Sequence, residues 1–221
     1  MKVIIAGAGA VGSFVASDLK QAGHDVLLIE RNPDLVARLR PSSEVDLFVG
    51  DACEVSALDE AGIADADVMV AATGEDQVNL VISLLAKQEF AVPRVVARIN
   101  EPRNKWLFND TWGVDVSVST PHLLTALIEE AVSVGSLVRL LEFGGGEAHL
   151  IEVTLAEDSP AQGRTIVDLG VPRDASIVAV IRAGHVVVPR GDTLIEVGDE
   201  VLALTTPASE DAVKRILVGG G

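Results

Sequence analysis

The sequence has no tyrosine, and aromatic residues make up only 3% of its 221 residues. Hydrophobic residues nevertheless account for 48%, so the core must be built from valine, leucine, isoleucine and alanine. Such an aliphatic core is typical of α/β proteins with buried parallel strands. The chain is long for one domain and comfortable for two.

Basic residues are scarce, because 17 lysines and arginines stand against 33 aspartates and glutamates, for a formal net charge of −16. Nucleic-acid binding needs a basic face that displaces counterions, and adsorption to anionic lipid needs basic clusters. The composition therefore argues against both and favours a highly soluble protein of the cytoplasm.

Cysteine and long hydrophobic runs are scarce as well. Cys53 is the only cysteine, which excludes an intrachain disulfide and indicates a reducing compartment. The opening MKVIIAGAGAVG is too short and too broken by glycine for a signal peptide or a membrane span. We therefore predict no direct membrane insertion, and any membrane role must come through a partner.

Strand-like and helix-like segments alternate six times up to residue 118, in units of about 20–25 residues. This spacing predicts a Rossmann-like, doubly wound parallel sheet over residues 1–118. Residues 119–136 predict an apolar helix that packs either within the chain or against another subunit. Residues 137–221, with short strands and a closing helix near Ser209–Leu217, predict a small α+β domain.

A glycine-rich turn follows the first predicted strand and opens the first predicted helix. In this context a GxGxxG sequence binds the phosphates of a nucleotide. Its glycines permit a tight turn, let a pyrophosphate approach the backbone, and allow the helix to pack closely on the strand. The predicted phosphate-binding residues are Gly7, Ala8, Gly9, Ala10, Val11 and Gly12.

An acidic residue, Glu30, ends the second predicted strand. A carboxylate at this position can accept hydrogen bonds from the hydroxyl groups of an adenosine ribose, and it repels a 2′-phosphate. NADP is therefore disfavoured. Arg31 either relaxes that preference or is an ordinary solvated arginine.

Further candidate residues follow the other strands, and ligands of open α/β sheets bind outside the carboxyl ends of strands. Asp51, with Ala52 after the third strand, either meets an adenine amino group or caps the next helix. Thr73, with Ala72 after the fourth strand, is either a phosphate or ribose contact or a turn residue. Arg98 on the fifth strand is the best candidate to offset phosphate charge, with a plain salt bridge as the alternative.

The sequence offers little for catalysis, since a dehydrogenase needs a proton donor or acceptor beside the nicotinamide. Of the four histidines only His122 is placed to approach the cleft, and a capping role competes there. No cluster has zinc spacing, so we predict neither catalytic nor metal-binding residues. An NAD-dependent oxidoreductase with a small C-terminal domain is the alternative function.

The sequence resembles the N-terminal domain of the TrkA/KtrA family in its GAGAVG turn, in Glu30, in Gly50–Ala52, in the AATG of residues 71–74 and in the VVARIN of residues 95–100. Residues 159–204 are similar to the C-terminal domain of the same family. Its members, also called RCK or KTN proteins, are cytosolic subunits that regulate potassium transporters and channels.

The resemblance implies that the first domain binds an adenine nucleotide, either NAD(H) or ADP, AMP or ATP. It also implies that dimers form through the helix after the sixth strand. These dimers would assemble into a ring, octameric or mixed with a paralogue, beneath an integral membrane potassium transporter or channel. The protein would then be a regulatory, gating subunit and not an enzyme, cytoplasmic and peripheral at the inner face of the cell membrane.

Two departures from the family pattern refine this expectation. Some ATP-responsive members carry arginine in the glycine turn where this chain has Ala10, which favours NAD(H), ADP or AMP over ATP. Some members place an acidic metal ligand where this chain reads Thr120-Pro121-His122, so no metal is expected there.

Overall fold

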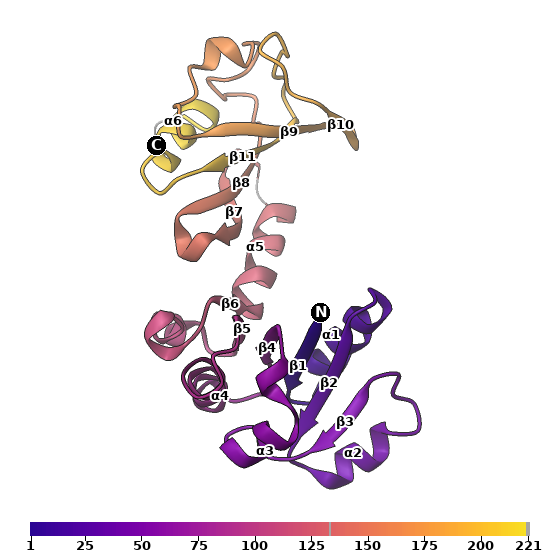
Figure 1. Cartoon of the computed structure of the whole chain (residues 1–221). Helices are drawn as coiled ribbons and strands as arrows, with labels where there is room; N and C mark the ends of the chain where they lie inside the picture. Colours follow the sequence, from indigo (N-terminus) through magenta and orange to yellow (C-terminus); the bar gives the residue numbers. More distant parts are fainter. Residues whose placement is uncertain (133, 220–221) are drawn as a thin grey trace. The chain divides into compact units, whose positions relative to one another are not determined.

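The chain divides into two compact units, Met1–Pro121 and His122–Gly221 (Figure 1). A computed structural model describes residues 1–132 and 134–219 of the chain. Each unit has a sheet and a hydrophobic core of its own.

The first unit is a six-stranded, fully parallel sheet in the order β3-β2-β1-β4-β5-β6. The order reverses between β1 and β4, which is the switch point at which doubly wound sheets bind ligands. The predicted Rossmann-like sheet is confirmed. Its strands are β1 (Lys2–Ala6), β2 (Asp25–Glu30), β3 (Asp46–Val49), β4 (Val68–Ala71), β5 (Arg94–Ile99) and β6 (Val116–Ser119).

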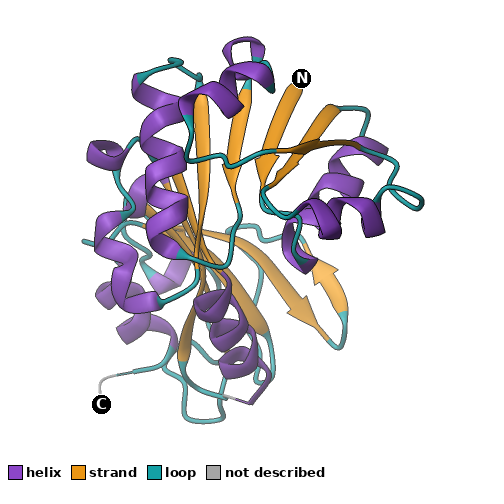
Figure 2. Ribbon diagram, turned by 90° about the horizontal axis from the view of Figure 1, so that it is seen from below, coloured by secondary structure: helices purple, strands orange, loops and turns teal. Residues whose placement is uncertain are grey.

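Helices cover both faces of this sheet (Figure 2). On one face α1 (Ala10–Gln21) and α2 (Pro33–Leu39) pack over the side chains of β1 and β2. On the other face α3 (Val55–Glu60) and α4 (Asp76–Gln88) pack over β1, β4 and β5. Because each buried aliphatic side chain contributes about 1.5–3 kcal/mol, these two mainly aliphatic layers stabilise the sheet, with Phe108 as the one buried aromatic residue among those described.

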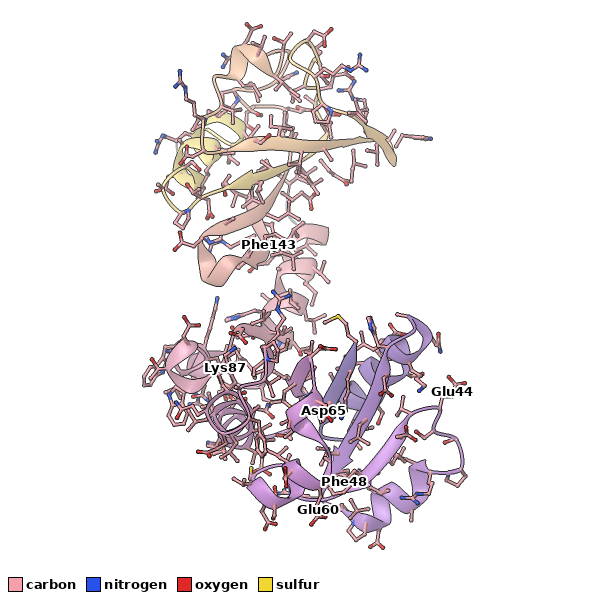
Figure 3. All side chains as sticks on the ribbon, in the orientation of Figure 1. Glu44, Phe48, Glu60, Asp65, Lys87 and Phe143 are labelled. Atoms are coloured by element: carbon pink, nitrogen blue, oxygen red, sulfur yellow. The ribbon has the colours of Figure 1, made fainter. Side chains whose placement is uncertain are left out.

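Local signals set several element boundaries. The side chain of Asn32 accepts hydrogen bonds from the amides of Asp34 at 3.0 Å and Leu35 at 3.3 Å, and Pro33 occupies the first turn of α2. Asparagine as N-cap followed by proline in the first turn is a helix-start signal that the sequence carries, and the structure confirms it. Lys87, near the end of α4 and labelled in Figure 3, pairs with Asp115 at 2.8 Å and ties the helix to the segment before β6.

Between the fifth and sixth strands the sequence pattern predicts a helix over Pro102–Asp110, and this prediction is wrong in helix type. The segment forms two 3₁₀ stretches, η2 (Pro102–Leu107) and η3 (Asp110–Trp112), and a further one, η1 (Ile63–Asp65), lies earlier in the unit. The Asn109 side chain accepts a hydrogen bond from the Thr111 amide at 2.9 Å and starts the second stretch. Asparagine competes for backbone donors in this way, and it interrupts the helix that the sequence pattern suggests.

The helix α5 (Thr120–Val132) crosses the boundary between the units. It lies within the predicted apolar segment of residues 119–136, and its last helical residue is Val132. The second unit continues with a five-stranded antiparallel sheet in the order β10-β9-β11-β8-β7. Its elements are β7 (Leu137–Phe143), η4 (Gly144–Gly146), β8 (Ala148–Thr154), η5 (Val167–Leu169), β9 (Ser176–Arg182), β10 (His185–Val187), β11 (Glu200–Thr205) and α6 (Glu210–Leu217).

Two sets of ion pairs lie inside the second unit. Arg182 on β9 contacts the fully buried Asp199, with its Nε 2.7 Å from Oδ1 and its Nη2 2.8 Å from Oδ2. Glu210 at the start of α6 accepts from Arg139 Nη2 at 2.6 Å and contacts His149 Nδ1 at 2.5 Å. The small α+β domain predicted for this part of the chain is confirmed.

Candidate functional site

The glycine-rich turn joins β1 to α1 at the carboxyl edge of the parallel sheet. Gly7 has a φ of +104°, and a Cβ atom there would lie 3.0 Å from the backbone of Thr73. A Cβ atom on Gly12 would lie 1.9 Å from the carbonyl oxygen of Gly7. A Cβ atom on Gly9 would have no neighbour within 4 Å. Gly7 and Gly12 are thus required by the fold, whereas Gly9 leaves open space at the start of α1.

Glu30 holds this turn in place. Its Oε2 accepts a hydrogen bond from the Ala8 amide at 2.9 Å, and its Oε1 accepts one from the Asn32 amide at 2.9 Å. Both bonds fix the carboxylate at the end of β2, beside the switch point. A carboxylate has about four acceptor positions, so it retains the capacity to accept from the hydroxyl groups of a ribose.

Arg31 forms an ion pair with Glu75, with Arg31 Nη2 3.1 Å from Glu75 Oε1. Both side chains are largely exposed, at 62% and 59%. Arg31 follows β2 and Glu75 follows β4, and β1 lies between these strands in the sheet. The pair therefore connects the two sides of the switch point. Arg31 is exposed, as expected for an ordinary solvated arginine, but it is paired with Glu75.

Asp51 lies in the turn after β3, where its Oδ1 accepts from the Cys53 amide at 2.9 Å. It therefore caps the turn that precedes α3, and contact with an adenine stays a prediction. Its neighbour Ala52 is buried. At Gly50 a Cβ atom would lie 2.5 Å from the ring of Phe48, which Figure 3 labels on β3, so a larger residue here would displace that ring.

Cys53 reports the electrostatics of this corner. Burial, the charge of Asp51 and a hydrogen bond with Asp51 raise the pKa of the thiol to about 11. Glu75 raises this pKa further, and Arg31 opposes the shift. The thiol is therefore protonated at neutral pH and unreactive, because the thiolate is the nucleophilic form.

Thr73 lies at the start of the loop after β4 and is bonded to α4. Its amide donates to Asn79 Oδ1 at 2.9 Å, and its hydroxyl donates to the same oxygen at 2.6 Å. The Asn79 Nδ2 donates in turn to the Arg98 carbonyl at 2.8 Å. Thr73 therefore acts as a turn residue, as the second interpretation proposed, and a ligand contact stays a prediction. Ala72 beside it is buried, and its side chain is a single methyl group.

Arg98 carries a buried donor with no partner. Its Nε atom is inaccessible to solvent and has no hydrogen-bond acceptor. Among the described residues it forms no ion pair, so the salt bridge considered as an alternative is absent. Buried donors are almost always satisfied, and an exception needs an explanation. An anionic ligand at the carboxyl edge supplies one.

Sequence reasoning missed a buried polar network on α4. Asp76 accepts hydrogen bonds from the Asn100 amide at 2.7 Å, the Glu101 amide at 3.0 Å and the Asn104 side chain at 2.8 Å. Burial opposes ionisation of Asp76, but these bonds outweigh it and lower its pKa. A signal was present, because polar residues recur along one helical face of α4 at Asp76, Asn79 and Ser83, and all three are buried.

The assembled edge thus offers backbone amides, a fixed carboxylate and an unpaired guanidinium donor, which together suit the ribose and phosphates of a nucleotide. Across residues 1–132 and 134–219 no group of His, Cys, Asp and Glu side chains is placed to hold a metal ion. No helix within those ranges has the length and apolar character needed to cross a bilayer.

Comparison with known proteins identifies the family. The profile of the TrkA-N domain matches residues 3–120, and that of the TrkA-C domain matches residues 150–218. The Trk system potassium uptake protein TrkA of Mycobacterium tuberculosis is 54% identical over 219 residues, which cover 99% of each chain. The chain belongs to the TrkA family. The resemblance in its motifs is thereby confirmed.

A more distant TrkA homologue, from Methanothermobacter thermautotrophicus, is 31% identical over 216 residues and covers 97% of this chain and 99% of that protein. Among solved structures, the GsuK channel bound to NAD matches all of this chain and 40% of its own length, with a TM-score of 0.71 and 20% identity. The Kef CTD of Shewanella denitrificans in its AMP-bound form matches 60% of this chain and 80% of its own length, with a TM-score of 0.50 and 26% identity. A TrkA-family chain thus shares its fold with proteins solved with nucleotides.

Proposed function

We propose that this chain is a nucleotide-binding regulatory subunit of a potassium uptake system and acts on an integral membrane transporter or channel. The observation that carries the proposal is the 54% identity to a Trk system potassium uptake protein over 99% of both chains. An identity this high over two successive domains supports a common role. The protein would lie in the cytoplasm, peripheral at the inner face of the membrane through its partner.

The nucleotide is NAD(H) or another adenine nucleotide, and it occupies the carboxyl edge of the first unit. The turn of Gly7–Gly12 binds the phosphates of the nucleotide, and Glu30 accepts hydrogen bonds from its ribose hydroxyls. Arg98 offsets the negative charge of the phosphates. Asp51 and Thr73 border the same edge. Support comes from structures of related fold solved with NAD, with ADP and with AMP.

We assign no catalytic residue to this edge. General acid–base catalysis works best when the pKa of the group lies near the working pH. Burial and Asp51 move the pKa of Cys53 up to about 11, and hydrogen bonds move that of Asp76 down. Both shifts lead away from neutrality, which favours a binding role over an NAD-dependent oxidoreductase.

Residues 1–118 would then bind the nucleotide, residues 119–136 would form a dimerisation helix, and residues 137–221 would form a regulatory domain. The support for dimerisation is the apolar surface of α5, where Leu124, Leu127 and Ile128 are exposed at 58%, 58% and 54%. Burying each contributes about 1.5–3 kcal/mol, which is enough for several together to hold a dimer. A larger ring, octameric or mixed with a paralogue, would be built from such dimers.

The nucleotide assignment is tested by thermal stabilisation of the purified protein with NAD, NADH, ADP, AMP and ATP. A ligand at 100 times its dissociation constant stabilises the fold by about 2.7 kcal/mol, a readily visible shift in melting temperature. Stabilisation by at least one of the five is expected. A melting temperature that none of them raises would refute the site.

The assembly is tested by light scattering of the protein and of the double variant Leu124→Glu/Ile128→Glu. The wild type is expected to be a dimer or larger at micromolar concentration, and the charged pair is expected to dissociate it. The matched control is Leu141→Glu/Val178→Glu, which places two charges on exposed positions of the second unit's sheet. A double α5 variant that stays dimeric would place the interface elsewhere.

The transport role is tested by potassium uptake in cells that lack this protein. Loss of uptake at low external potassium is expected, with rescue by the wild-type chain. Unchanged uptake would contradict the role.

A further inference from the structure

We propose that Glu75 is a specificity-determining residue of the nucleotide site, because it holds Arg31 in an ion pair and keeps this cation from receiving a 2′-phosphate. The inference rests on the proposed nucleotide site and deepens it. It makes exclusion of 2′-phosphorylated nucleotides the work of two carboxylates. Glu30 repels the phosphate directly, and Glu75 occupies the cation that would otherwise offset that repulsion.

The first step concerns the position of Glu30. The amides of Ala8 and Asn32 both donate to its carboxylate at 2.9 Å, so the carboxylate is fixed at the end of β2. In a doubly wound sheet, the residue at this point meets the ribose hydroxyls of the adenosine. A phosphate on the 2′-oxygen would therefore be brought against Glu30.

The second step concerns Arg31, the residue next to Glu30 in the chain. A guanidinium here is suited to receive a 2′-phosphate, since arginine binds phosphate through paired N–H groups. In this structure Arg31 Nη2 instead lies 3.1 Å from Glu75 Oε1, on the loop after β4. The guanidinium is thus drawn from the β2 side of the switch point towards β4.

The third step is the balance of charge at this corner. Asp51, Glu75 and Arg31 all lie close enough to Cys53 to act on its thiol, and Glu30 precedes Arg31 in the chain, so three carboxylates and one guanidinium are gathered here. Besides burial, three of these four groups shift the pKa of the Cys53 thiol: Asp51 and Glu75 raise it, and Arg31 lowers it. The corner is therefore net negative, and a phosphate dianion adds to the excess. Neutralising Glu75 removes one of these charges and frees Arg31.

The pair is also suitable for a clean test. Both side chains are more than half exposed, at 62% and 59%, and exposed ion pairs contribute little to stability. Replacing Glu75 should therefore leave the fold intact. A change in ligand preference can then be read without a change in folding.

The experiment compares AMP with adenosine 2′,5′-bisphosphate, which differ only in the 2′-phosphate, and NADH with NADPH, by calorimetry. In Glu75→Gln we expect the preference for the unphosphorylated member of each pair to fall about fivefold to tenfold. Affinity for AMP and NADH should change less than about twofold. The effect should weaken in high salt, because exposed charges are screened.

Three variants sharpen the result. Glu75→Asp keeps the charge and should keep most of the preference. Glu101→Gln, which removes the carboxylate of the exposed Glu101–Arg103 pair, is the matched control and should leave the preference unchanged. The double variant Arg31→Ala/Glu75→Gln should lose the gain, because Arg31 is the group that receives the phosphate.

The outcomes separate this inference from the proposed function. If the wild type binds neither AMP nor NADH, the nucleotide site itself fails. If it binds them and Glu75→Gln keeps the wild-type preference, the role of Glu75 is refuted. If the double variant retains the full gain, charge alone explains it and Arg31 is not the receptor.

Discussion

In the first unit, polar side chains at the carboxyl edge of the sheet order loops around an open site, whereas in the second unit the ion pairs of Arg182 and Glu210 join elements of the unit itself. At the first edge, Glu30, Asn79 and Thr73 order the loops, and the Arg98 Nε is left without an acceptor. In the second unit, the Arg182 guanidinium donates hydrogen bonds to Asp199, Glu196 and the Leu194 carbonyl. A buried donor left over distinguishes a place prepared for a ligand from an ion pair that serves the fold.

The largest expected effect is a loss of stability when the glycine turn is disrupted. In Gly12→Ala the new methyl group would lie 1.9 Å from the Gly7 carbonyl oxygen, so the turn must move at a cost of about 3 kcal/mol or more. Urea unfolding followed by tryptophan fluorescence measures this, because Trp106 and Trp112, the only two tryptophans, both lie in the first unit. Wild-type stability would contradict this close contact between Gly12 and Gly7.

Gly9→Ala is the matched control for that change. Its methyl group has no neighbour within 4 Å, so stability should stay within about 0.5 kcal/mol of the wild type. Nucleotide binding should nevertheless be lost, since the methyl group fills the space through which phosphate approaches. Normal binding by Gly9→Ala would place the phosphates elsewhere.

The second prediction concerns the second unit alone. Arg182→Ala leaves Asp199, which is 0% exposed, without its cation and should destabilise this unit by about 3 kcal/mol. Circular dichroism should show the loss, while tryptophan fluorescence and nucleotide affinity stay unchanged. The exposed Arg190→Ala is the control. If the tryptophan transition moves as well, the two units do not unfold independently.

The third prediction is a loss of nucleotide affinity without a loss of stability. Arg98→Ala removes a charge-assisted bond to phosphate, worth about 1.5–3 kcal/mol, so nucleotide affinity should fall at least about tenfold. Stability should hardly change, since the donor has no partner to lose. Arg94→Ala, at the exposed amino end of the same strand, should bind normally. Equal affinities of Arg98→Ala and the wild type would exclude this contact.

The smallest effect is in the pH dependence. Burial opposes ionisation of Glu210, but bonds from Arg139 and His149 outweigh it and lower its pKa below the ordinary 4.5. Burial also opposes ionisation of Asp76, but hydrogen bonds from uncharged donors outweigh it and lower the pKa of Asp76 below the ordinary 3.8. Each group is more acidic when folded, so its contribution is present above the ordinary value and is lost as pH falls through the folded one.

Urea denaturation between pH 2 and pH 7 should therefore show acid destabilisation of both units, on the order of 1 kcal/mol for each group. Glu210→Gln should flatten the curve of the second unit, and Asp76→Asn that of the first. Added salt should weaken the Glu210 contribution more, since only its partners carry charge. Equal salt sensitivity of the two would contradict this distinction.

Much of the first unit was predictable from local patterns. The alternation of apolar strands with helices, the glycine turn and the Asn32 cap each depend on residues close together in sequence. The 3₁₀ segments at Pro102–Trp112 were not predictable, because asparagine side chains compete there with the helical backbone. The order of strands in the second unit also required the structure, since short antiparallel strands pair in many ways.

The sequence by itself determined the doubly wound sheet, the phosphate-binding turn and the acidic residue at the end of β2, because each follows from short-range periodicity and backbone sterics. Only the tertiary structure decided that Arg31 pairs with Glu75, 44 residues away, and that Asn79 bonds the Arg98 carbonyl, 19 residues away. The physical reason is that a parallel sheet brings the carboxyl ends of distant strands to one edge. Which side chains meet there depends on loop geometry and burial, and no local pattern records either.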